Sequence, residues 1–87
     1  MGVTVELTYD MSKALGTRSF QVDGVATVAD IVRVTKERFG DRAEEFDRLT
    51  RVAAVSVNGV LVTHRRGLRT SVADGDRVMF VKAAAGG

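Results

Sequence analysis

The most regular stretch of this 87-residue sequence is Thr27-Val28-Ala29-Asp30-Ile31-Val32-Arg33-Val34-Thr35-Lys36-Glu37-Arg38-Phe39-Gly40. It opens as a capping box, in which the Thr27 hydroxyl accepts a hydrogen bond from the Asp30 amide while the Asp30 carboxylate reaches back. Gly40 fits the position just beyond a helix end. The stretch therefore predicts the principal helix of the chain. One face of that helix carries mostly apolar residues at helical spacing: Val28, Ile31, Val32, Thr35 and Phe39.

Strand patterns precede this helix, and a second helix follows it. Apolar and polar residues alternate over 3–8 and again over 18–22, which is the period of a half-buried strand, so these segments predict two strands paired as a hairpin. Between them, residues 10–17 predict a loop that contains a helical turn. Residues 41–49 predict a shorter helix that Asp41 caps, and its inward side chains are expected to be Ala43, Phe46 and Leu49.

Three more strands are expected in the last third of the chain. Residues 52–57 and 60–62 flank Asn58-Gly59, two residues that tolerate the positive φ angles of a type I′ hairpin turn. Asp74-Gly75-Asp76 is a second tight turn, and it leads into a last strand over 77–81. Together the segments predict an α+β domain with one principal helix packed on one face of a sheet.

Composition excludes several classes of function. The chain has no cysteine, so it has no disulfide framework, thiolate metal site or nucleophilic thiol. Its single histidine, His64, makes neither a metal site nor a nucleophile–base pair, so we expect no metal and no autonomous enzyme. The net charge of +2 is too balanced to predict a nucleic-acid partner. No apolar run approaches the roughly 20 residues that span a bilayer, so we expect no membrane partner and a cytoplasmic protein.

The last six residues have the composition of a narrow stalk: Lys82-Ala83-Ala84-Ala85-Gly86-Gly87. Glycine has no side chain to clash and is not restricted to negative φ. The α-carboxylate of Gly87 is ionised at neutral pH and can enter an active site that a larger residue would block. The chain therefore divides into a domain over 1–81 and a flexible tail over 82–87, which would reach roughly 20 Å when extended.

Several stretches also occur in the order in which a known family has them: Val3-Thr4-Val5, Ala14-Leu15-Gly16-Thr17-Arg18, Thr27-Val28-Ala29-Asp30-Ile31, Val55-Ser56-Val57-Asn58-Gly59, Gly67-Leu68, Asp74-Gly75-Asp76-Arg77-Val78 and Ala85-Gly86-Gly87. Over its full length the chain resembles the β-grasp, or ubiquitin-like, sulfur carriers. These include the small subunit of molybdopterin synthase, the thiamin thiazole sulfur carrier and a carrier of cysteine biosynthesis. The resemblance implies a β-grasp fold: a mixed sheet of four or five strands, one main helix on one face and a short second helix.

The resemblance further implies a protein co-substrate that has no catalytic machinery and binds no cofactor. An adenylyltransferase of the ubiquitin-activating type would transfer AMP from ATP to the Gly87 carboxylate. Sulfide or a persulfide would then displace AMP and leave a thiocarboxylate. A sulfur-accepting synthase would take the sulfur from the threaded tail, where Gly86 leaves room beside the reacting carbonyl.

A carrier of this kind must fit two partners in turn. On the last strand Val78 and Phe80 should face the core, and Met79 and Val81 should face outward. With Leu61 near them, they would form an apolar docking patch, unless a neighbouring loop half-covers them. The patch would continue into the tail residues that partners contact: Lys82, Ala83, Ala84 and Ala85. The basic loop over 64–69 leaves open whether its arginines contact a partner too: Arg65, Arg66 and Arg69.

Departures from the family pattern leave the pathway open. Molybdopterin-type carriers usually place two prolines before the tail, where this chain has Lys82-Ala83, and an aromatic pair on the last strand, where Val81 replaces the second aromatic. Thiamin-type carriers lack the prolines but are generally shorter, without a segment like 41–49. The sequence is thus compatible with a sulfur donor for molybdopterin, thiamin or a dedicated metabolite. It is also compatible with a ubiquitin-like modifier joined to target lysines through Gly87, or with a non-catalytic interaction module.

Overall fold

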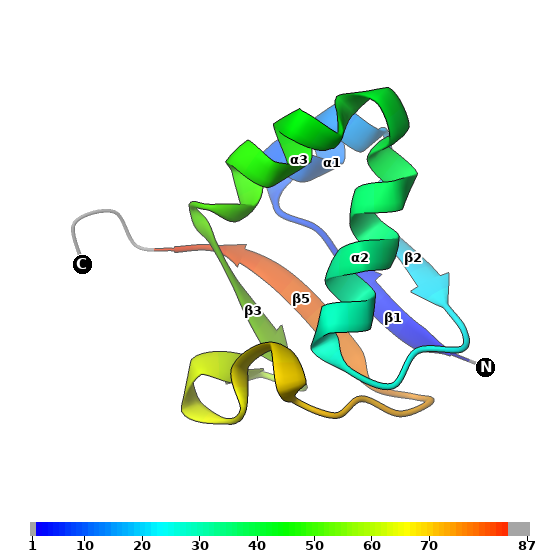
Figure 1. Ribbon diagram of the computed structural model, residues 1–87, viewed down its shortest axis with the longest axis vertical. Coiled ribbons are helices and arrows are strands. Elements are labelled where there is room, and N and C mark those ends of the chain that lie inside the picture. The colour runs from blue at the N-terminus through cyan, green and yellow to red at the C-terminus, as the bar shows by residue number, and fades with distance from the viewer. Residues whose placement is uncertain (1, 84–87) are drawn as a thin grey trace.

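Five strands form one mixed sheet, and the computed structural model describes it within residues 2–83 (Figure 1). The sheet order is β2-β1-β5-β3-β4, in which β1 and β5 run parallel and the other neighbours run antiparallel. The elements follow in the chain as β1 (Val3–Glu6), α1 (Tyr9–Leu15), β2 (Ser19–Val22), α2 (Val28–Phe39), η1 (Gly40–Arg42), α3 (Ala43–Thr50), β3 (Ala53–Val57), β4 (Val60–Leu61), η2 (Val62–His64), η3 (Gly67–Arg69) and β5 (Arg77–Lys82), where η marks a 3-10 turn. The expected α+β, β-grasp architecture is confirmed.

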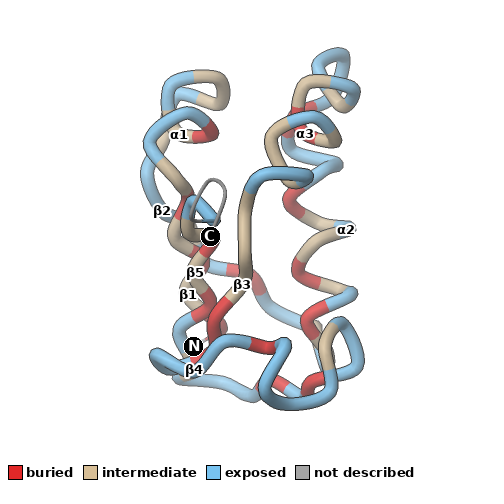
Figure 2. Tube along the Cα trace, turned by 90° about the vertical axis from the view of Figure 1, so that its left-hand side faces the viewer, coloured by how far each residue is buried: buried red, intermediate tan, exposed pale blue. Residues whose placement is uncertain are grey.

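The core lies between the sheet and the helices, as the buried residues in Figure 2 show. Helix α2 begins with the predicted capping box: the Thr27 hydroxyl accepts from the Asp30 amide at 3.3 Å, and the Asp30 carboxylate accepts from Thr27 N–H at 3.2 Å. The same carboxylate accepts from Ala26 N–H at 2.9 Å. These backbone hydrogen bonds, from Ala26 and then Thr27, hold the pKa of Asp30 below its usual value.

Two helix predictions need correction. Residues 9–15 form a full helix, α1, and not a loop with a single turn; the Thr8 hydroxyl caps it by accepting from Met11 N–H at 3.1 Å. Asp41 does not cap α3, because η1 comes first and α3 begins only at Ala43, with no side-chain cap from Arg42. A side-chain cap thus marks the start of α1 but not that of α3.

The predicted strands are confirmed with small shifts of their ends. β4 stops at Leu61 because Val62 turns into the core, where it is 7% exposed and opens η2. β5 continues to Lys82, one residue past the predicted end at Val81. Within residues 2–83, no helix is both long and apolar enough to cross a bilayer.

Candidate functional site

The end of β5 fixes the place from which the tail departs. Lys82 pairs with Ala53 on β3, and Ala83 N–H donates to the Val52 carbonyl at 2.8 Å. Proline, which molybdopterin-type carriers have in this segment, could not donate this hydrogen bond. Four residues then remain, with a reach of roughly 14 Å at full extension, instead of the 20 Å expected for six. Those four lie outside the described residues, so the expectations for Ala84, Ala85, Gly86 and Gly87 stay predictions.

The face of the sheet that points away from the helices carries the predicted apolar patch. Val78 and Phe80 are buried on the inner face, as predicted, so the alternate residues Met79 and Val81 lie on the outer face. The strand register places Ser56 opposite both Met79 and Leu61, which brings these three residues into one row across β5, β3 and β4. Met79 and Val81 are half-buried, and Leu61 is 37% exposed. Val81 lies two positions along β5 from this row, opposite Ala54, and on the same face. We call Met79, Val81 and Leu61 the outer-face row; their role in docking stays a prediction.

The two turns predicted from the sequence, Asn58-Gly59 and Asp74-Gly75-Asp76, are joined by hydrogen bonds. Asn58 has a φ of +50° and Gly59 one of +87°, as a type I′ turn requires. The Asn58 amide donates to the Asp76 carboxylate at 3.0 Å, and Ala73 N–H donates to the same carboxylate at 2.9 Å. These hydrogen bonds, the Asn58 one first, hold the pKa of Asp76 below its usual value. Because Arg77 N–H also donates to the Asn58 side chain at 3.0 Å, the two turns together fix the start of β5.

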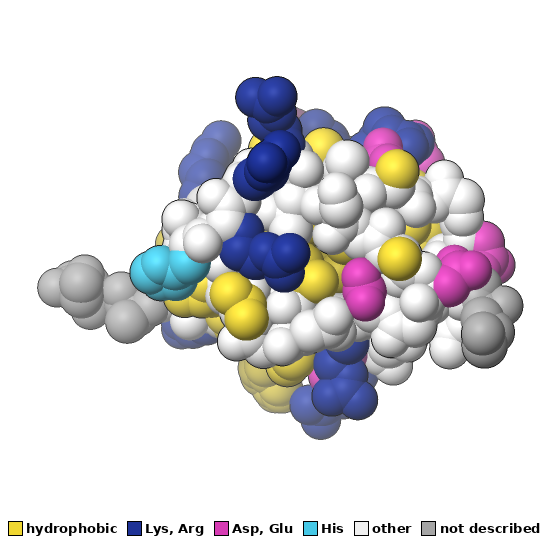
Figure 3. Space-filling model, turned by 90° about the horizontal axis from the view of Figure 1, so that it is seen from below, with side chains coloured by type: hydrophobic (Ala, Val, Ile, Leu, Met, Phe, Trp, Pro, Cys, Tyr) yellow, Lys and Arg dark blue, Asp and Glu magenta, His cyan; other side chains and the backbone are white. Residues whose placement is uncertain are grey.

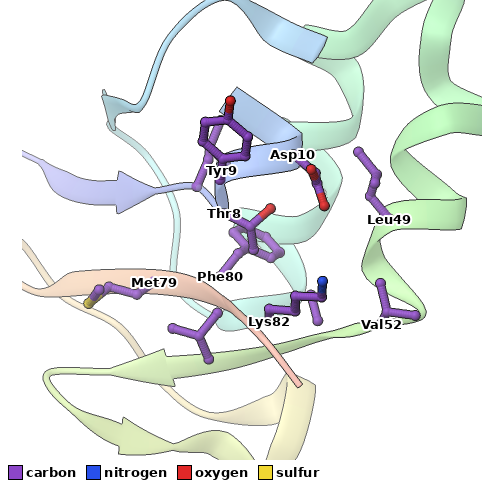
Figure 4. Close-up of a pocket in the computed structure, with 11 residues that line it drawn as sticks. Thr8, Tyr9, Asp10, Leu49, Val52, Met79, Phe80 and Lys82 are labelled. Carbon is purple, nitrogen blue, oxygen red and sulfur yellow. The ribbon is translucent and has the colours of Figure 1, made fainter. Parts of the chain in front are cut away.

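A hollow that no sequence pattern marked lies beside the end of β5 (Figure 4). Its volume is about 400 Å³, and its lining comes from α1, α3, the start of β3 and the end of β5. We call it the root groove and define it by Tyr9, Asp10, Leu49, Val52 and Lys82. The sequence alone did not predict this groove, because the most distant of its lining residues are more than 70 positions apart in the chain. Which of them lie side by side depends on the strand register.

The arginines of the basic loop are exposed at the end of the molecule that carries η2 and η3. Figure 3 looks onto that end and shows basic side chains gathered over part of it. Among residues 2–83, no carboxylate lies within ion-pair distance of Arg65, Arg66 or Arg69. The described part of the chain also contains no cluster of three or more acidic or histidine side chains that could hold a metal ion.

Comparison with known proteins identifies a matching sequence family and several solved structures of similar fold. Residues 8–87 match the sequence profile of the ThiS family. The crystal structure of the BexX/CysO complex from Amycolatopsis orientalis is similar to this chain at 30% identity, covering 99% of this chain and 100% of that one with a TM-score of 0.79. CysO from Mycobacterium tuberculosis is similar at 25% identity, with 95% and 100% coverage and a TM-score of 0.78.

Likeness in fold extends to protein modifiers. Small archaeal modifier protein 1 from Methanosarcina acetivorans has a TM-score of 0.76 over 98% of this chain and 95% of that one, at 19% identity. At that identity the likeness shows the fold alone. No curated protein sequence matches the chain significantly.

Proposed function

Because this chain belongs to the ThiS family, we propose that it is a sulfur carrier that bears its sulfur as a thiocarboxylate on Gly87. The observation that carries the proposal is the family match itself, which runs through Gly87 and so includes the tail. The described fold supports it, since the last strand, β5, ends at Lys82, five residues before Gly87. ATP enters as the co-substrate of the activating enzyme and not as a ligand of the carrier.

The proposed reaction has two steps at one carbon atom. A Gly87 carboxylate oxygen attacks the α-phosphorus of ATP, pyrophosphate leaves, and the product is a mixed anhydride with AMP. Sulfide then attacks the glycyl carbonyl carbon, and the C–O bond to AMP breaks with its electron pair on the AMP oxygen. The adenylation is needed because a carboxylate oxygen is a poor leaving group. The thiocarboxylate that remains is a sulfur nucleophile, and it requires no cysteine in a chain that has none.

Docking in this proposal uses the outer-face row and the tail together. CysO of Amycolatopsis orientalis was crystallised in complex with BexX, and we propose that this chain likewise docks on the enzymes that load and unload it. Met79, Val81 and Leu61 would supply an apolar contact at the mouth of the partner's channel. Gly86 and Gly87 would pass into the channel. The acceptor would be a synthase of a sulfur-containing cofactor or metabolite.

Intact-mass measurement tests the proposal. The protein is incubated with ATP, sulfide and an adenylyltransferase of the ubiquitin-activating type, and a variant that lacks Gly87 is the control. We expect the mass to rise by the difference between one sulfur and one oxygen atom, and only in the protein that has Gly87. No rise with any of several activating enzymes would leave the interaction module as the better interpretation. A gain of the mass of a whole second protein would instead identify a modifier.

A further inference from the structure

The root groove is one part of a longer furrow between α1 and α3. A second hollow, of about 560 Å³, adjoins it around Lys82 and Ala83, and a third lies between the two helices. All three share Asp10 and Leu49 in their linings, which places them in one continuous depression. The furrow therefore runs along the helices and opens beside the residue from which the tail leaves.

The strand register explains why the hydrophobic core does not extend to the end of β5. Val78, Phe80 and Lys82 occupy alternate positions on β5 and so face the helices. The first two are buried, but the third is a lysine, and the residue paired with it is the small Ala53. A bulky apolar pair at this level would close the sheet against α3. Lysine opposite alanine instead leaves Val52 54% exposed at the lip of the groove.

The surface of the groove combines apolar anchors with a positive edge. Tyr9 is 73% exposed, and exposed tyrosines are over-represented among the residues that dominate protein interfaces. Arg48 pairs with Glu45 at 3.5 Å, whereas Arg51 and Lys82 have no carboxylate within ion-pair distance among residues 2–83. The remaining acidic residue in the lining of the hollow at Lys82 is Asp10. The amine of Lys82 points into the groove, on the side where Asp10 and Val52 line it (Figure 4).

We propose that the root groove, together with the adjoining hollow at Lys82 and Arg51, is a second docking site and that it binds an acidic and apolar segment of the activating enzyme. It lies beside the outer-face row, since Met79 and Val81 also contribute to its lining. An apolar side chain of that segment would cover Val52 and Leu49, and a carboxylate would meet Lys82 and Arg51. Charge complementarity favours this occupant, since the hollow that adjoins the groove is lined by Lys82, Arg51 and the Glu45-paired Arg48 but by a single carboxylate, that of Asp10. The inference rests on the proposed function, because it assigns the groove to the enzyme that must hold the root of the tail while Gly87 reacts.

Steady-state kinetics of adenylation test the inference. ATP–pyrophosphate exchange is measured with the activating enzyme at saturating ATP and with the carrier as the varied substrate. Val52→Glu places a carboxylate on the exposed lip, and Lys82→Glu reverses the charge in the groove. We expect each to raise KM at least tenfold while kcat stays within twofold of the native value, because the reacting tail is unchanged.

Matched controls separate docking from folding. Val60→Glu adds the same charge at a valine that is 45% exposed on β4, and Arg42→Glu reverses a charge on η1, before α3 begins; both should keep the native KM. Urea unfolding of all four variants checks that each is folded. A native KM for both groove variants would overturn the inference while the proposed function stands. Failure of the native protein to be adenylated at all would overturn the proposed function, and the groove assignment with it.

Discussion

At the scale of the single residue, Phe46 joins the two helices to the sheet. It is 1% exposed, and its ring lies 5.1 Å from that of Phe39 and 6.1 Å from that of Phe80. Phe46→Ala should lower the free energy of unfolding by about 3–5 kcal/mol, because the cavity adds to the lost burial. Urea denaturation measures the effect. Val60→Ala, at a largely solvent-accessible valine, is the control and should change stability by less than about 0.5 kcal/mol.

Asp76 gives the second prediction at this scale, and it concerns pH. Its pKa is lower in the folded protein than in the unfolded chain, so its contribution to stability is complete above the unfolded pKa of about 3.9. That contribution is lost as the pH falls through the folded pKa. Asp76→Asn should therefore be less stable than the native protein at pH 7, and the difference should shrink steadily below about pH 4.

Urea midpoints taken at several pH values check this behaviour. Asp74→Asn is the matched control, since it lies in the same turn and receives no hydrogen bond from the described residues. A stability gap between native protein and Asp76→Asn that stayed constant down to pH 2 would contradict the assigned hydrogen bonds.

At the scale of the element, the cap of α2 could be read from sequence because it is local. Thr27 and Asp30 stand three residues apart, and both hydrogen bonds of the capping box form between them. Thr27→Ala should lower the free energy of unfolding by about 1 kcal/mol, since it removes one acceptor from the first turn. Thr27→Ser keeps the hydroxyl and should therefore retain most of the free energy of unfolding that Thr27→Ala loses. Equal loss in both variants in urea denaturation would show that the methyl group of Thr27 matters more than its hydroxyl.

Other element boundaries escaped the sequence for a physical reason. Thr8 continues the alternation of the first strand and also caps α1, so the same residue satisfied two patterns. Asp41 had the right chemistry for a cap, but the chain makes a 3-10 turn first. The mixed sheet with one main helix on one face followed from the family resemblance, and the outward positions of Met79 and Val81 followed from the period of two. The root groove could not follow from either, because it depends on Lys82 meeting Ala53 across two strands.

At the scale of the whole molecule, the fixed root of the tail sets a length. Ala83 is bonded to the body through Val52, so only residues 84–87 can carry the Gly87 carboxylate into a partner. Deleting Ala84 and Ala85 shortens the maximal reach by roughly 7 Å, about half of the total. Adenylation by the activating enzyme should then fall by at least 100-fold, with the urea midpoint unchanged, because β5 ends at Lys82 and the deletion keeps every described residue.

A lengthened tail tests whether the loss of adenylation in the deletion variant comes from the shorter reach or from the missing residues themselves. Two alanines inserted after Ala84 keep every native residue and add reach, so adenylation should fall far less than in the deletion variant, chiefly through a higher KM. Ala83→Pro removes the N–H that bonds to Val52, and in the deletion background it should recover part of the lost rate by freeing one more residue. If the shortened tail were adenylated at the native rate, the carboxylate would react at the surface of the partner. Threading from a fixed root would then be wrong.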